Sequence, residues 1–390
     1  MGKTKIITGT SAAAEAARLC DVDVIAAYPI TPQTTCVEKL AEFVANGELY
    51  AEYIKVESEH SAMSACIGAS ATGARAFTAT ASQGLALMHE TLFQASGMRL
   101  PIVMMNANRA LASPINIWND QQDSISQRDT GWIQIYVEDN QETLDSIIQA
   151  YRIGEHEDVL LPVMVNLDGF VLTHTVEPVK IPDEKDVLDF VGIYEPKHAY
   201  LDPDRPITQG PVGVPEYYME FKYEQEKAME RALKVIKEIN EEFANKFGRK
   251  YGNGLVEEYN LENAETVIVA MGSVCGTIKE VIDKLKEKGE EYGLLRIRTY
   301  RPFPIDDIKK SLKNCKNVCV LDKNITFGLN KGALFTDVVG YLKDKKVSNY
   351  IVGLGGRDIK PEDIVDIFKD GEKCGDMSTK WVGLRKDLVE

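Results

Sequence analysis

Apolar runs alternate with stretches of helical spacing along the first part of the chain. Short apolar runs bounded by turn residues predict buried strands, and apolar residues three or four positions apart predict helices. The predicted strands are residues 22–27, 53–56, 76–80 and 102–106, and the predicted helices are residues 34–45, 61–74 and 85–96. This alternation predicts an α/β fold in which helices cover both faces of a parallel sheet. In such a fold, ligands bind outside the carboxyl ends of the strands.

The periodic pattern breaks down from about residue 178 to residue 254, where prolines cluster with glycines. We interpret this part as a long irregular connection that is followed by a charged helix at residues 217–247. A loop of this length in a compact protein is usually functional or wraps a neighbour. We therefore expect residues 178–254 to contact a partner.

Apolar strands alternate with helices again in the last part of the chain. The predicted strands are residues 266–271, 294–297, 318–321 and 350–352, and the predicted helices are residues 278–288, 331–342 and 361–368. This pattern predicts a second, smaller doubly wound domain. We therefore expect two domains, residues 1–254 and residues 255–390, with the irregular connection inside the first.

Composition and charge exclude several classes of protein. The 390 residues are 44% hydrophobic and 27% charged, which is typical of a globular protein. A formal net charge of −15 argues against general nucleic-acid binding. No apolar run approaches the ~18 residues of a membrane span, and the first residues lack the features of a signal peptide. The seven cysteines are scattered and odd in number, which is typical of reduced thiols, so we expect a cytoplasmic protein without membrane partners.

Most motifs of nucleotide and metal sites are missing. Gly68 and Gly73 have the glycine spacing of a phosphate-binding loop, but the Lys-Ser/Thr pair is absent, and no GxGxxG motif follows a strand. Cys315 and Cys319 form a close pair without a second pair to complete a zinc or iron–sulfur site. We therefore expect no metal site in this chain. The GLGGRD sequence at residues 353–358 is either an anion-binding turn or an ordinary glycine turn.

Three polar segments near the ends of predicted strands carry the candidate chemistry. They are YPITP at residues 28–32, VESEHS at residues 56–61 and NANRA at residues 106–110. Each segment also has a purely structural interpretation. The first could be an ordinary proline turn, the second could cap the helix that follows, and Arg109 could form a surface ion pair. The small residues of the helix at 61–74 could likewise allow close packing alone or the approach of a cofactor or second subunit.

Together, these segments resemble the alpha subunits of pyruvate:ferredoxin oxidoreductases, in the 2-oxoacid:ferredoxin oxidoreductase family. The resemblance extends to TATASQGLALMHE, NRALASPINIWNDQQD, QRDTGWIQ and EPKHAYLDPDRPITQG in the first domain. It continues through MGSVCGT, YRPFP and GLGGRD in the second domain, so it covers essentially the whole chain. The resemblance implies a thiamine-diphosphate-enzyme fold, with a pyrimidine-binding-type doubly wound domain followed by a transketolase C-terminal-like α/β domain.

The resemblance also implies roles for five residues. Glu59 matches the carboxylate that hydrogen-bonds N1′ of the thiamine aminopyrimidine and assists proton transfer, and Pro29 and Ile30 match cofactor-binding positions. Arg109 would bind the carboxylate of a 2-oxo acid through charge-assisted hydrogen bonds. Thr31 would donate a hydrogen bond to the substrate from a rigid turn. Thr31, Glu59 and Arg109 are therefore the candidate catalytic residues.

The implied reaction is the CoA-dependent oxidative decarboxylation of pyruvate to acetyl-CoA and CO2, with ferredoxin as the electron acceptor. Thiamine diphosphate is the implied cofactor. This chain has neither the family's GDG motif for the diphosphate and Mg2+ nor a four-cysteine ferredoxin motif. The resemblance therefore implies that the cofactor is shared with a partner subunit, that Mg2+ and [4Fe–4S] clusters lie in partner subunits, and that the complex contains beta, gamma and delta subunits.

Three alternatives remain open. The branched-chain acid 2-oxoisovalerate shares the carboxylate and ketone of pyruvate, so an alpha subunit of the same type could serve it. A nicotinamide dehydrogenase is the main other enzyme class for an α/β chain of this length, although the missing GxGxxG motif disfavours it. A scaffold subunit that has lost its site is disfavoured because Thr31, Glu59 and Arg109 are all present.

Overall fold

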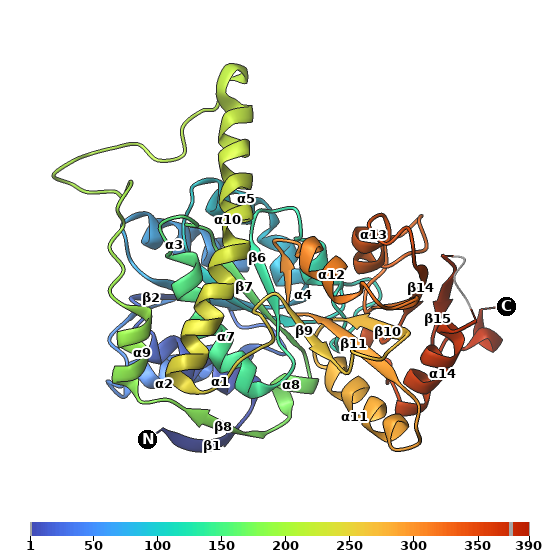
Figure 1. Ribbon diagram of the computed structural model, residues 1–390. Coiled ribbons are helices and arrows are strands. Elements are labelled where there is room, and N and C mark those ends of the chain that lie inside the picture. Colours follow the sequence, from blue (N-terminus) through green and yellow to red (C-terminus); the bar gives the residue numbers. More distant parts are fainter. Residues whose placement is uncertain (1, 374–376, 390) are drawn as a thin grey trace.

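The computed structural model describes residues 2–373 and 377–389 and contains two largely parallel sheets with helices on both sides (Figure 1). The first sheet has seven strands, and all of its pairs are parallel except the first. Their order across the sheet is β12 (Thr299–Arg301), β6 (Ile133–Tyr136), β7 (Val163–Asp168), β5 (Val103–Asn108), β4 (Ala76–Thr80), β2 (Val24–Ala27) and β3 (Glu52–Lys55).

Helices cover both faces of this first sheet because alternate residues of its strands point to opposite sides. One face packs against α1 (Gly9–Leu19), α2 (Thr34–Ala45) and α7 (Asn140–Gly154). The other face packs against α3 (Glu59–Ala71), α4 (Ser82–Leu87) and α5 (His89–Gly97). The single helix expected at residues 85–96 is therefore wrong: α4 begins earlier, and the chain bends at Met88 between the two helices. Short helices α6 (Gln122–Ile125) and α8 (Val171–His174) lie in the connections.

The second domain is a smaller α/β unit, as the sequence predicts. Its strand order is β15 (Thr379–Trp381), β14 (Lys346–Ile351), β13 (Asn317–Asp322), β10 (Thr266–Ala270), β11 (Tyr292–Ile297) and β9 (Val256–Tyr259). Only β9 runs antiparallel to its neighbour. The faces are covered by α11 (Val274–Lys286) and α14 (Pro361–Gly371) on one side, and by α12 (Ile305–Ser311) and α13 (Ala333–Val339) on the other. Two single turns of 3-10 helix are Leu354–Gly356 and Lys386–Leu388.

The irregular connection is shorter than the 178–254 range that the sequence predicts. β8 (Glu177–Ile181) pairs with β1 (Lys3–Ile7) in a two-stranded antiparallel sheet, and α9 (Glu184–Val191) follows it. Pro178 and the edge position of β8 hide this strand in the sequence pattern. Residues 192–214 form the irregular part, and α10 (Pro215–Phe247) matches the predicted helix at 217–247. Figure 1 shows the first turns of α10 projecting beyond the body of the domain.

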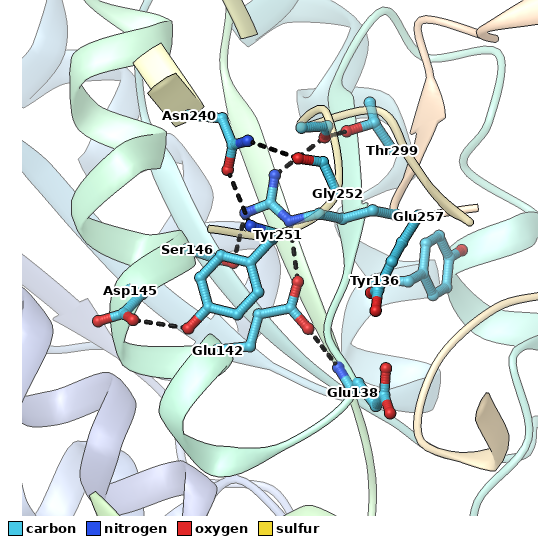
Figure 2. A network of polar contacts seen from close by, with 12 residues as sticks. Tyr136, Glu138, Glu142, Asp145, Ser146, Asn240, Tyr251, Gly252, Glu257 and Thr299 are labelled. Atoms are coloured by element: carbon cyan, nitrogen blue, oxygen red, sulfur yellow. Dashed lines mark hydrogen bonds and ion pairs between the residues drawn. The ribbon is translucent and has the colours of Figure 1, made fainter. Parts of the chain in front are cut away.

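Buried charges join the two domains. Arg298, between β11 and β12, donates from Nε to Glu142 Oε1 of α7 at 2.8 Å. Arg296 of β11 also binds Glu142, and its Nη1 donates to Glu257 Oε2 at 2.8 Å. Figure 2 shows the Glu142 carboxylate among polar side chains of both domains. Each charge has partners, so this network holds the two domains together. Strand β12 adds a second connection, because it pairs with β6 of the first sheet.

Three properties of the described residues bear on the class of protein. The six cysteines within residues 2–373 and 377–389 are buried thiols, and Cys374 lies outside the described residues. None of the described helices combines the length and apolar composition that a bilayer crossing requires. In the same part of the chain, no three His, Cys, Asp or Glu side chains converge as a metal site would need.

Candidate active site

The three polar segments lie at the carboxyl edge of the first sheet. β2, β4 and β5 are parallel neighbours, so the residues that follow them share one edge. Thr31 follows β2, Arg109 follows β5, and Glu59 follows β3 as the first residue of α3. The chain leaves β2 toward β3 but leaves β4 toward β5, in opposite directions along the sheet. Doubly wound folds bind their ligands at such a switch point.

Glu59 is a buried carboxylate without a partner in the part of the chain that the structure describes. Ser58 caps α3 by accepting a hydrogen bond from Ser61 N at 3.2 Å, which places Glu59 in the first helical turn. The capping interpretation of this segment therefore holds for Ser58. Glu59 itself is only 6% exposed, and no described residue forms a hydrogen bond or ion pair with its carboxylate. Burial of such a group is costly unless a ligand supplies a partner.

The backbone at Gly84 packs closely against both Glu59 and Thr80. Thr80 ends β4, and its buried hydroxyl has no hydrogen-bond partner among the described residues. A Cβ atom at Gly84 would lie 2.6 Å from Glu59 Oε1 and 2.6 Å from Thr80 Oγ1, so only glycine leaves both groups in place. The site therefore offers an unpaired carboxylate, an unpaired hydroxyl and a close backbone. This set fits the edge of an aminopyrimidine, which carries ring-nitrogen acceptors and an amino donor.

The neighbouring carboxylate, Glu57, has a different environment. Glu57 is exposed, and its carboxylate accepts a hydrogen bond from the Ser61 hydroxyl in the same helical turn. This hydrogen bond lowers the pKa of Glu57. The Glu57 carboxylate therefore already has a partner in its own helical turn, and Glu59 is the carboxylate of this segment that remains available to a ligand.

Arg109 binds two backbone carbonyls and keeps one amino group unpaired. Its Nη1 donates to the Thr31 carbonyl at 3.0 Å, and its Nε donates to the Asn116 carbonyl at 2.9 Å. No described residue accepts a hydrogen bond from its Nη2. Burial lowers the pKa of the Arg109 guanidinium while the Asp123 carboxylate opposes this shift, and arginine remains cationic throughout. The surface-ion-pair interpretation is wrong, because Arg109 is only 7% exposed.

The turn after β2 carries the other three predicted residues. Thr31 is exposed, and Arg109 fixes its carbonyl. Pro29 is exposed, whereas Ile30 is half-buried and packs against the hydrophobic core. The structure therefore brings Thr31 and Arg109 together, and it gives no direct hydrogen bond between either residue and Glu59 among the described contacts. The turn thus has a packed side and a side that is open to a ligand.

Two supporting residues, Asp123 and Asn116, lie outside the sequence predictions. Asp123 accepts a hydrogen bond from Arg109 N at 3.0 Å. Asn116 Nδ2 donates to the Gly355 carbonyl of the second domain at 3.0 Å, while Gly355 N donates to Asp120 Oδ2 at 3.1 Å. The N–H of Gly355 is thus used within the chain and is not open to an anion. Both supporting residues lie in the NRALASPINIWNDQQD segment at 108–123, which carries part of the family resemblance but gives neither residue a role.

Comparison with known proteins places this chain in a family. Residues 15–241 match the family "Pyruvate flavodoxin/ferredoxin oxidoreductase, thiamine diP-bdg", and residues 264–364 match "Pyruvate:ferredoxin oxidoreductase core domain II". The chain is 75% identical to pyruvate synthase subunit PorA of Methanocaldococcus jannaschii over 99% of both chains. It is also 46% identical to ketoisovalerate oxidoreductase subunit VorA of Pyrococcus horikoshii over 98% of both chains.

A solved structure has the same fold at low sequence identity. It is the 2-oxoglutarate:ferredoxin oxidoreductase from Magnetococcus marinus, with a TM-score of 0.76 and 21% identity. The match covers 95% of this chain and 65% of that chain. The expected fold class, a pyrimidine-binding-type domain followed by a transketolase C-terminal-like domain, is confirmed. The chain therefore belongs to the pyruvate:ferredoxin oxidoreductase family, among its alpha-type subunits.

Proposed function

We propose that this chain is the alpha subunit of a pyruvate synthase, a complex that oxidatively decarboxylates pyruvate with coenzyme A and reduces ferredoxin, and that also runs in reverse. The names of its relatives support pyruvate as the substrate. The observation that carries the proposal is the buried carboxylate of Glu59, which has no partner among the described residues and packs against Gly84. A folded chain keeps such a carboxylate when a ligand completes its hydrogen bonds.

Glu59 would hold the aminopyrimidine half of thiamine diphosphate. Its carboxylate would hydrogen-bond N1′ of the ring, and its burial keeps water from competing for that bond. Thiamine diphosphate, when bound, supplies the nucleophilic carbon for attack on a 2-oxo acid. Pro29 and Ile30 would contact the cofactor from the turn after β2, where the exposed side of the turn faces away from the core.

Arg109 and Thr31 would bind the 2-oxo acid. The unpaired Nη2 of Arg109 is the natural donor to the substrate carboxylate, since Nη1 and Nε already bind backbone carbonyls. These two bonds hold the guanidinium in one orientation, so little rotamer freedom is lost on binding. The Thr31 hydroxyl would donate to the substrate's oxygen from a turn that Arg109 itself steadies.

The rest of the chemistry would lie in partner chains. Beta, gamma and delta subunits would supply the diphosphate and Mg2+ contacts and the [4Fe–4S] clusters that pass electrons one at a time to ferredoxin. Residues 192–214 and the projecting start of α10 are candidates for contacting these partners. We place the complex in the cytoplasm, where the six described thiols would stay reduced.

Replacing Glu59 in the assembled complex tests the proposal. Glu59→Gln keeps the shape but removes the proton-accepting carboxylate, so we expect turnover of pyruvate to fall by ~10²-fold or more, with the complex still assembled. Glu57→Gln is the matched control, because Glu57 is an exposed carboxylate two residues before Glu59 and the substitution is the same. We expect it to leave turnover unchanged. Near-wild-type turnover of Glu59→Gln would remove Glu59 from the mechanism.

A branched-chain 2-oxo acid is the second candidate substrate, because a ketoisovalerate oxidoreductase subunit is also a full-length relative. Arg109 and Thr31 read only the carboxylate and ketone that both acids share. Extra methyl groups contribute about 1–3 kcal/mol of discrimination in an apolar pocket. We expect a higher kcat/KM for pyruvate than for 2-oxoisovalerate on the intact complex. The reverse order would change the substrate while leaving the roles of Arg109 and Thr31 in place.

A further inference from the structure

Asp123 is a fully buried carboxylate at the centre of the site's supporting hydrogen bonds. It is the second residue of α6, and no part of it is exposed. Its Oδ2 accepts hydrogen bonds from Ser82 N and from Arg109 N, both at 3.0 Å. Its Oδ1 accepts a hydrogen bond from Asn108 Nδ2 at 2.7 Å. One carboxylate thus binds the loop after β4 and the loop after β5.

The two loops held by Asp123 reach both halves of the candidate site, because one carries Gly84, which packs against Glu59, and the other carries Arg109. Ser82 begins α4, two residues before the Gly84 that makes space for Glu59. Ser82 also has a φ of 50°, a backbone conformation that side-chain-bearing residues rarely adopt and that needs support from its surroundings. Its hydroxyl donates to the Ala110 carbonyl at 2.6 Å, which ties the same loops together a second time.

Only an ionised carboxylate satisfies all of these donors. Oδ2 receives two peptide N–H groups, and Oδ1 receives the Asn108 amide and Ser124 N at 2.8 Å. An asparagine at this position would present an amino group to one of these donor pairs and would repel it. Asp123 forms no ion pair within the described residues, so its burial is supported by these donors and by a longer hydrogen bond from Asn106 Nδ2 to Oδ2, at 3.4 Å.

We propose that Asp123 is a positioning residue that fixes the Glu59 half of the site relative to Arg109. It touches neither predicted ligand and acts through the backbone of Ser82 and Arg109. This inference rests on the proposed function, because the positions that it fixes matter only if Glu59 and Arg109 serve one reaction. The bonds from Ser82 N and Arg109 N to the same oxygen are the structural basis of the coupling.

Asp123→Asn in the assembled complex tests this role. We expect kcat/KM to fall by about 10²-fold, which is the scale of a small misplacement of reacting groups. We also expect thiamine diphosphate to bind about 10-fold more weakly in calorimetry, because losing a hydrogen bond to a charged group loosens the start of α4. Both values are measured with whichever 2-oxo acid the wild-type complex turns over fastest, so failure of the pyruvate assignment stays separate from failure of this inference.

Asp322→Asn is the matched control. Asp322 is also fully buried, and the partners of its carboxylate among the described residues, including Leu334 N and Phe335 N at the start of α13, all lie in the second domain. We expect this variant to lower the melting temperature about as much as Asp123→Asn does, with unchanged kcat/KM and cofactor affinity. If both variants lose activity only in proportion to stability, Asp123 is merely structural and the proposal fails.

A second variant keeps the test open if Asp123→Asn does not assemble. Asn108→Ala removes the side-chain donor that holds Oδ1 of Asp123 and leaves Asp123 itself in place. We expect kcat/KM to fall by about 10-fold, the loss that corresponds to one hydrogen bond. Wild-type kcat/KM in Asn108→Ala, or in a stable Asp123→Asn complex, would overturn the proposal.

Discussion

The Lys323 ammonium lies 3.0 Å from Oδ2 of Asp168, and this pair joins the end of β13 to the end of β7 across the two domains. Ser273 donates to the same oxygen from its backbone N at 3.0 Å and from its hydroxyl at 2.5 Å. Burial alone would raise the pKa of Asp168, but Lys323 and Ser273 outweigh burial and lower it. Lys323 and Ser273 of the second domain therefore keep Asp168 ionised at the carboxyl edge of the first sheet. Asp168 ends β7, and β7 is the neighbour of β5, the strand that leads to Arg109.

Lys323→Met should destabilise the chain strongly. Removing the cation leaves the Asp168 carboxylate buried and uncompensated, which costs about 3–5 kcal/mol of unfolding free energy. The double variant Lys323→Met with Asp168→Asn should recover part of the loss, because no charge is then left unpaired. Denaturant titration measures both values. Lys284→Met is the control, since Lys284 pairs with Glu280 in an exposed position and should have no measurable effect. Equal effects of Lys323→Met and Lys284→Met would contradict the importance of the buried pair.

Asp123 should give opposite pH trends in stability and activity. Burial raises its pKa to about 6, with Asp120 adding repulsion, while the hydrogen bond from Asn108 opposes the shift. The folded-state pKa lies above the unfolded value, so the carboxyl's stability contribution is fully present below the unfolded pKa and is lost as pH rises through about 6. Protonation below about pH 6 nevertheless blocks an acceptor oxygen that the site loops need.

We therefore expect kcat/KM to fall as the pH drops below about 6. Over the same range, protonation of Asp123 makes folding more favourable. The Asp123→Asn complex should lack that step in its pH profile, since it has no proton to gain. Steady-state kinetics and denaturant unfolding across this pH range give the two curves. An identical pH step in wild type and variant would assign the titration to another group.

Gly84→Ala should damage the site without unfolding the domain. The new Cβ would lie too close to the Glu59 side chain and to the Thr80 hydroxyl, so the Glu59 carboxylate must move from its present position. We expect turnover in the complex to fall by about 10²-fold. Gly68→Ala is the control, because Gly68 lies in α3 itself and a Cβ there meets nothing within 4 Å. Alanine at that helical position should even stabilise the helix by about 1 kcal/mol. Equal activity of the two variants would show that the position of the Glu59 carboxylate does not matter for turnover.

The sequence predicted where the candidate residues lie in the fold better than the residues that support them. Apolar runs and the polar residues after them are local signals, so they marked the three segments at strand ends, and the resemblance to the family singled out Thr31, Glu59 and Arg109 within them. The expected helix at 61–74 begins two residues too late, since the polar start of α3 gives no apolar periodicity. Asp123 was missed because its partners, Ser82 and Arg109, are distant in the sequence and meet only in the folded chain. The strand β12 was missed for the same reason: three residues carry little pattern, and its partner β6 lies far away along the chain.

Oxalate should bind to the complex much more weakly than pyruvate. Arg109 has one unpaired amino group to offer a carboxylate, and the partner group on the turn is the neutral hydroxyl of Thr31. The second carboxylate of oxalate would lie opposite Thr31, where a hydroxyl compensates a charge poorly. A buried charge without a partner costs several kcal/mol, so we expect the inhibition constant of oxalate to exceed the KM of pyruvate by ~10²-fold or more. Thr31→Arg should narrow this gap by supplying the missing cation, whereas Thr31→Ser should leave it unchanged. Tight inhibition of the wild-type complex by oxalate would mean that another cation faces Thr31 in the assembled site.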